Sequence, residues 1–103
     1  MSLTEKDTDC GIARALDVIG GKWTLLIIRD LIVRPRRFGE LEQSLSGISP
    51  RTLTIRLKEL EADGVLKRDC SAGEFHPMYC LTEKGYSLQN ILDQMRSWGE
   101  VKA

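Results

Sequence analysis

FGELEQSLSGISPRTLTIRLKELEADGVLKR, residues 38–68, is the stretch that decides the fold, because it predicts two short helices joined by a glycine turn. The second helix has a clear start: Ser49 can cap the amides of the first turn, and Pro50 suits the first helical position because it has no N–H to lose. Gly64 marks its end, since glycine is the usual left-handed residue just past a helix. A unit of this kind can place its second helix in a groove of DNA.

Both helices of this unit are amphipathic. In the first, residues 38–45, apolar side chains recur at three- and four-residue spacing, and Gly47 makes the turn. Successive residues of a helix are rotated by about 100°. In the second helix this rotation places Leu53, Leu57 and Leu60 on one face, which is expected to point inward. Its opposite face, which is the one expected to meet DNA, carries Arg51, Thr54, Ile55 and Lys58.

Two further helices are predicted upstream. Residues 10–19 carry apolar side chains at helical spacing and are followed by a glycine pair, which indicates an amphipathic helix. Residues 23–32 are apolar on nearly every side, with polar positions near Arg29 and Asp30. We expect this helix, which includes Trp23, at the centre of the core and ended by Pro35.

Two strand-like segments follow Gly64. VLKRDC at 65–70 and MYCLT at 78–82 flank a stretch with a glycine and a proline, so they predict a β-hairpin, the wing of a winged helix. Thr82 is the predicted cap of one last helix that runs through Trp98. The predicted fold class is mainly α with a small β-hairpin, an α+β winged helix-turn-helix. It forms one domain over 1–103, with 1–9 as a flexible tail.

Composition limits the functional classes. The 103 residues carry 15 Lys and Arg against 15 Asp and Glu, so attraction to nucleic acid must come from local charge. Such a concentration exists, because residues 43–58 contain basic but no acidic side chains, and RPRR at 34–37 lies just upstream. The chain shows neither a secretory signal nor a membrane-spanning apolar run, which favours the cytoplasm.

The basic and hydroxyl side chains around the second helix suit DNA recognition. Arg51 can bind guanine O6 and N7, Thr52 and Thr54 can reach base edges or phosphates, and Ile55 can touch a thymine methyl group. Arg56 lies between the two faces, so a phosphate contact and an internal ion pair are both open. The ordinary alternative for such a face is a solvated surface. The predicted DNA-binding residues are Arg36, Arg37, Ser49, Pro50, Arg51, Thr52, Thr54, Ile55, Arg56 and Lys58.

The terminal helices predict a homodimer. The last helix has an apolar stripe that can pack within its own domain or against a second copy, and so small a chain favours the second arrangement. The predicted dimer-interface residues are Ile12, Leu16, Leu88, Ile91, Leu92, Met95 and Trp98.

The sequence carries no catalytic, metal-binding or nucleotide-binding pattern, so neither an enzyme nor a cofactor is expected. Three cysteines argue against a disulfide framework. Cys10, at the start of a helix, is a candidate redox-sensing thiol, whereas Cys70 and Cys80 are expected to be inert fillers in the hairpin strands. His76, the one histidine, is expected to be a loop residue.

The segments GGKWTLLIIRDL, RRFGELEQSLSGISPRTLTIRLKELEADGVLKR and YCLTEKG, in that order, resemble the HxlR-type family of MarR-like winged helix-turn-helix regulators. The resemblance runs from Cys10 to Trp98. It implies a bacterial or archaeal transcription factor that dimerises through its terminal helices and binds a roughly palindromic operator. It also places Arg37 in the RRF segment, Ser49 to Lys58 on the recognition helix, and Cys10 at a position where some members sense electrophiles or oxidants.

These observations predict a homodimeric, sequence-specific regulator that binds double-stranded DNA and acts as a repressor. Its two recognition helices would enter major grooves about 34 Å apart. One alternative is a winged-helix module that binds another protein, although the outer helix face offers no aromatic anchor for one. A second alternative keeps DNA binding and makes an oxidant, acting on Cys10, or a small molecule the effector.

Overall fold

The structure, a computed structural model, describes residues 10–68 and 77–103, which form helices around one small antiparallel sheet. In chain order the elements are α2 (Gly11–Ile19), α3 (Lys22–Val33), β1 (Arg36–Arg37), α4 (Phe38–Ser44), α5 (Pro50–Ala62), β2 (Leu66–Arg68), β3 (Met78–Leu81), α6 (Glu83–Tyr86) and α7 (Gln89–Lys102).

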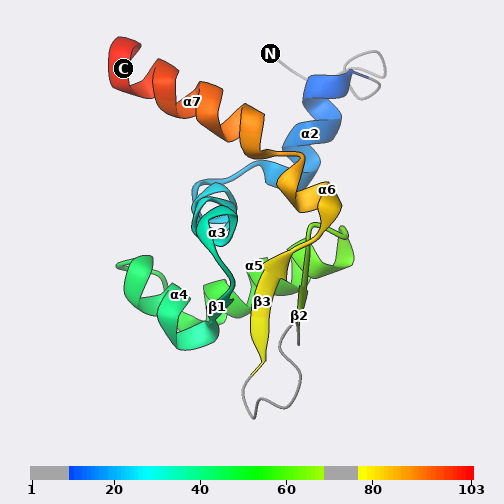
Figure 1. Cartoon of the computed structure of the whole chain (residues 1–103), viewed down its shortest axis with the longest axis vertical. Coiled ribbons are helices and arrows are strands. Elements are labelled where there is room, and N and C mark those ends of the chain that lie inside the picture. Colours follow the sequence, from blue (N-terminus) through cyan, green and yellow to red (C-terminus); the bar gives the residue numbers. More distant parts are fainter. Residues whose placement is uncertain (1–9, 69–76) are drawn as a thin grey trace.

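Helix α3 occupies the middle of the molecule, as its all-round apolar sequence predicts. Helices α2 and α7 extend at one end, while α4, α5 and the β2–β3 hairpin form the other end (Figure 1). The side chains of Ile27, Ile28 and Leu31 on α3 are fully excluded from solvent. Trp23 is only partly buried and packs at the edge of the core.

The helix-turn-helix unit follows the local signals of its sequence. The Ser49 hydroxyl accepts a hydrogen bond from the Thr52 backbone N–H at 3.1 Å, which caps α5. Gly47 and Gly64 have φ values of +93° and +75°, a region that side chains with a Cβ rarely adopt. The predicted turn and helix end are therefore confirmed at these two positions. The predicted inner face is confirmed as well, because the leucines of α5 are buried: Leu53, Leu57 and Leu60.

The hairpin is part of a three-stranded sheet in the order β1-β3-β2. Strands β2 and β3 pair antiparallel as predicted, with Leu66 opposite Leu81 and Arg68 opposite Tyr79. Strand β1 was not predicted, and it pairs antiparallel with the other edge of β3, with Arg36 opposite Tyr79. The sheet thus joins the start of α4 directly to the hairpin. Cys70 and His76 lie outside the described residues.

The prediction of one C-terminal helix beginning at Thr82 is wrong, because two helices are present. Thr82 caps the short α6 through a hydrogen bond from the Gly85 N–H at 3.1 Å. The chain then tightens at Ser87 and Leu88, where the Leu88 N–H bonds the Gly85 carbonyl, before α7 begins. Helix α7 also continues beyond Trp98, to Lys102.

Asp30 departs from the expectation of a polar surface on α3. It is 6% exposed, and its Oδ1 forms an ion pair with Arg29 at 3.0 Å. Its Oδ2 has no hydrogen-bond partner. An aspartate was expected to be exposed, but the fold buries this one, and Arg36 of β1 donates to its backbone carbonyl. No helix in the described parts of the chain is long and apolar enough to cross a membrane.

Candidate nucleic-acid interface

The outer face of α5 combines exposed cations with a rigid attachment to the core. Arg51 and Lys58 are exposed on this face, and neither forms a hydrogen bond or ion pair with the described residues. Ile55 between them is 43% exposed. Because the leucines on the opposite face are buried, the helix cannot rotate, and these three side chains stay directed outward. The face is therefore preorganised for a polyanion.

The hydroxyl groups at the start of α5 are partly occupied within the helix. Ser49 donates to the Thr52 hydroxyl at 2.9 Å in addition to capping the Thr52 amide. The Thr54 hydroxyl donates to the Pro50 carbonyl at 2.8 Å. Ser49 and Thr54 can still accept hydrogen bonds, which suits them to amino groups of bases, whereas the Thr52 hydroxyl can also donate to a phosphate oxygen.

Arg56 forms an ion pair with Glu59, one turn further along α5. Of the two alternatives for this residue, the internal pair is the one that the free protein forms. A phosphate contact by Arg56 would have to replace it.

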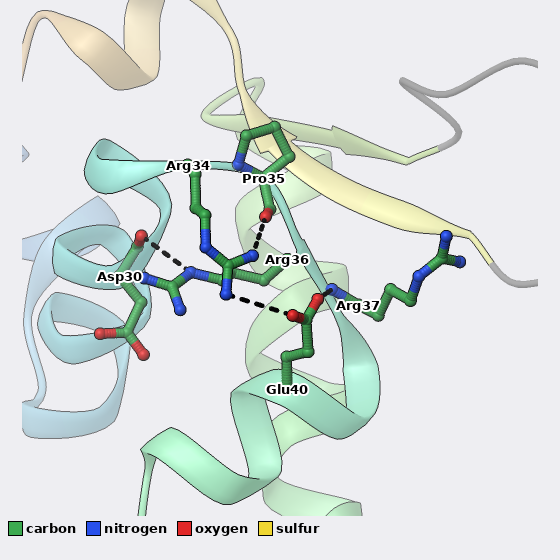
Figure 2. A network of polar contacts seen from close by, with 6 residues as sticks. All are labelled: Asp30, Arg34, Pro35, Arg36, Arg37 and Glu40. Carbon is green, nitrogen blue, oxygen red and sulfur yellow. Dashed lines mark hydrogen bonds and ion pairs between the residues drawn. The ribbon is translucent and has the colours of Figure 1, made fainter.

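A network of arginines around Glu40 fixes the entry to α4 (Figure 2). The Glu40 carboxylate accepts the Arg37 backbone N–H at 2.8 Å and pairs with Arg34 at 3.2 Å. The Arg37 N–H lowers the pKa of Glu40 most, and Arg34 and Arg36 lower it further. The carboxylate is therefore charged at neutral pH, and it closes the N-terminus of α4 as in a capping box.

The two arginines of β1 have different surroundings, although both were predicted to contact DNA. Arg36 Nε donates to the Asp30 backbone carbonyl at 3.3 Å, so this side chain turns toward α3. The side chain of Arg37 extends away from the network (Figure 2). Neighbouring residues of a strand point to opposite faces, which explains the difference. Arg37 is the better placed of the two for a partner outside the protein.

One cation beside this surface was absent from the predicted set. Arg68, the last residue of β2, is exposed and lies with its guanidinium 5.9 Å from the centre of the Tyr79 ring. Together with Lys58 and Thr54 it lines a recess between α5 and the hairpin. The only sequence signal for a role of Arg68 was its position at the end of the first hairpin strand. Its place beside α5 became clear only from the pairing of the three strands.

Cys10 lies at the N-terminus of α2 as a free, exposed thiol. The backbone N–H groups of Ala13 and Ile12 favour the thiolate and lower the pKa of Cys10, and Arg14 adds a smaller electrostatic effect. In its thiol form, Cys10 makes no capping hydrogen bond of standard geometry. Cys80 on β3 is disulfide-bonded, so the expectation that it is an inert filler is wrong.

The predicted dimer residues are mostly exposed in the single chain. Leu92 is buried and Leu88 is half-buried against the core. The others form apolar surface on α2 and α7: Ile12, Leu16, Ile91, Met95 and Trp98. Val101 extends this surface toward the C-terminus with 75% exposure.

A sequence model of the family described as HxlR-like helix-turn-helix matches residues 18–103. The chain belongs to this family. It is also 40% identical over 96 residues to the HTH-type transcriptional regulator YybR of Bacillus subtilis (strain 168), covering 88% of this chain and 74% of that protein. The chain is therefore a transcriptional regulator with a helix-turn-helix DNA-binding fold.

Two solved structures of the same fold are redox or quinone-linked regulators by their own descriptions. The reduced form of the redox regulator HypR has a TM-score of 0.82 at 39% identity, covering 88% of this chain and 91% of that one. Quinone-bound YodB from B. subtilis has a TM-score of 0.74 at 35% identity, covering 86% of this chain and 94% of that one. Such neighbours confirm the winged helix-turn-helix fold class.

Proposed function

We propose that the protein is a homodimeric repressor that binds a roughly palindromic operator, with α5 of each subunit in a major groove. The observation that carries this proposal is the outward face of α5, on which Arg51 and Lys58 are exposed and form no ion pair within the described part of the chain. A cation without a partner in the free protein forms a phosphate or base contact without first breaking an internal ion pair.

The N-terminal half of α5 supplies the base-reading positions in this proposal. Arg51 lies in the first turn, where recognition helices contact base edges, and it can bind guanine with two parallel hydrogen bonds. Thr52 and Thr54 accept from base amino groups, and Ile55 contacts a thymine methyl group. Arg37 and Lys58 hold the flanking phosphates. Ser49 and Pro50 set the start of the helix, and we assign Arg36 and Arg56 to internal contacts.

An Arg51→Ala protein is expected to lose sequence discrimination more than total DNA affinity. Each bidentate contact to guanine is worth about 1–3 kcal/mol of discrimination, so the ratio of operator to random-DNA affinity should fall about 5- to 150-fold per half-site. Fluorescence anisotropy with both DNAs measures this ratio, after the operator has been selected from the DNA upstream of the gene. Arg96→Ala, which removes an exposed arginine of α7, is the matched control. An unchanged ratio for Arg51→Ala would exclude its base-reading role.

The apolar face of α2 and α7 is the proposed dimer seam. Ile12 and Leu16 on α2 and Ile91, Met95 and Trp98 on α7 are exposed at the end of the molecule far from α4 and the hairpin (Figure 1). A second copy packed there would bury them and leave both recognition helices free for DNA.

A thiol input through Cys10 is a second candidate property of the same regulator. It is supported by the free, exposed thiol, by its lowered pKa, and by the description of HypR as a redox regulator. A larger thiolate fraction reacts faster with oxidants. In a wild-type protein treated with hydrogen peroxide, operator affinity is expected to change, and dithiothreitol should restore it.

The Cys10→Ser protein is expected to bind the operator as well as the untreated wild type and to ignore peroxide. The hydroxyl keeps the size of the side chain but cannot be oxidised under these conditions. Operator affinity before and after treatment is the measurement. Should the serine variant respond to peroxide like the wild type, the input lies elsewhere and this candidate fails.

A further inference from the structure

We infer that Arg68, together with Lys58, binds a backbone phosphate of duplex DNA in the recess between α5 and the hairpin, with Tyr79 as the positioning residue of Arg68. This inference rests on the proposed function and assigns a contact outside the recognition helix.

The recess is lined by side chains from four elements, α4, α5, β2 and β3. It has a volume of about 250 Å³ and opens between the start of α4, one side of α5 from Thr54 onward, and strands β2 and β3. Among the described residues, its lining is formed by Phe38, Thr54, Leu57, Lys58, Glu61, Arg68 and Tyr79. Glu61 is the one carboxylate among them, and neither cation forms an ion pair with it. Both cations therefore remain available to an anion.

Arg68 is held in place without using its hydrogen-bond donors. Its guanidinium lies 5.9 Å from the centre of the Tyr79 ring, within the range of a cation–π contact. The two residues are direct partners in the β2–β3 register, and cross-strand partners share one face of a sheet. Tyr79 is buried, so its ring is a fixed support. The N–H groups of Arg68 form no hydrogen bond or ion pair with residues 10–68 or 77–103, and a phosphate can accept two of them at once.

The distance between Lys58 and the start of α5 matches the width of the groove. Lys58 follows Arg51 by seven residues, which is about 10 Å along a helix. The major groove is about 12 Å wide. When Arg51 lies against base edges, Lys58 and the recess beside it therefore lie at the phosphate border. A phosphate there would be contacted from α5 and from β2 together, which fixes the hairpin against the DNA.

The test is the salt dependence of DNA binding for two neighbouring variants. Arg68→Gln and Lys67→Gln remove one exposed charge each from the same strand, but adjacent strand residues point to opposite faces, so Lys67 does not line the recess. Losing one phosphate contact lowers the slope of log affinity against log salt by about 0.9. For each half-site of the dimer, Arg68→Gln is expected to show this drop and about tenfold weaker binding, equally on operator and random duplex. Lys67→Gln should show a clearly smaller change in both quantities.

Three further results decide between the possible failures. If Arg68→Gln and Lys67→Gln give the same slope while the wild type binds duplex DNA, this inference is overturned and the proposed function stands. If the wild type binds no duplex DNA, both this inference and the proposed function fail. For Tyr79, the Phe variant should keep the wild-type slope because the ring remains, and a Leu variant of unchanged melting temperature should lose about as much slope as Arg68→Gln. A wild-type slope in that Leu variant would remove Tyr79 from the proposal.

Discussion

A Trp98→Glu protein is expected to be a monomer that has lost most of its operator affinity. Aromatic side chains bury roughly 150–250 Å² each, and Trp98 is 64% exposed in the single chain. At roughly 25 cal/mol per Å², covering that exposed part contributes about 2–4 kcal/mol from each subunit. The variant loses this contribution in both subunits and places a carboxylate in the dimer interface. The dissociation constant of the dimer should therefore rise by roughly a thousandfold or more.

The neighbouring residue on the same helix is the control for this change. Ser97→Glu adds the same charge to α7, but it lies on a different side of the helix from Ile91, Met95 and Trp98. It should leave the protein dimeric. Sedimentation velocity gives the oligomeric state, and anisotropy on the operator gives the affinity, which should fall at least about a hundredfold in the monomer because only one half-site is bound. A Trp98→Glu dimer at micromolar concentration would contradict the proposed seam.

A Gly85→Ala protein is expected to be strongly destabilised although only a methyl group is added. A Cβ at this position would lie 2.2 Å from the Val65 carbonyl oxygen and 2.9 Å from Leu81 Cδ2. The carbonyl is backbone and cannot rotate away, so α6 must move off the strand that it covers. Overpacking of this kind costs about 1–3 kcal/mol, which lowers the melting temperature by roughly 5–20 °C in a domain of this size. Differential scanning calorimetry measures it.

The matched control is the same substitution where there is space. At Gly39, on α4, a Cβ would meet nothing within 4 Å. Gly39→Ala should therefore keep or raise the melting temperature, because alanine favours helix by about 1 kcal/mol over glycine. If both variants melt at the wild-type temperature, the close packing of α6 on the Val65 carbonyl is not present in solution.

The sequence predicted those parts of the fold that depend on local chemistry. The start of α5 at Ser49 and Pro50 and the turn at Gly47 are confirmed, because capping, fixed φ and left-handed φ are properties of single residues. The hairpin was predictable from two apolar segments around a turn. The outer face of α5 followed from helical periodicity once the helix had been placed.

The parts that failed depend on contacts between distant segments. Strand β1 is two arginines long, and only its pairing with β3 some 40 residues later makes it a strand. That pairing also turns Arg36 inward. The break at Ser87 and Leu88 was missed because neither residue is a glycine or a proline, the usual signals of a helix end. The burial of Asp30 has no local signal, since an aspartate of a helix is ordinarily exposed.

The pairing of β3 with strands on both of its edges has a mechanical consequence. The two-residue β1 joins the segment before α4 to β3, which also pairs with β2 in the hairpin. The helix-turn-helix and the wing therefore form one rigid DNA-binding unit. Neither half can tilt toward DNA without breaking the ladder that they share. In the dimer that we propose, an effector would therefore act through α2 and α7 to change the distance between the two DNA-binding units. The structure of each unit would stay unchanged.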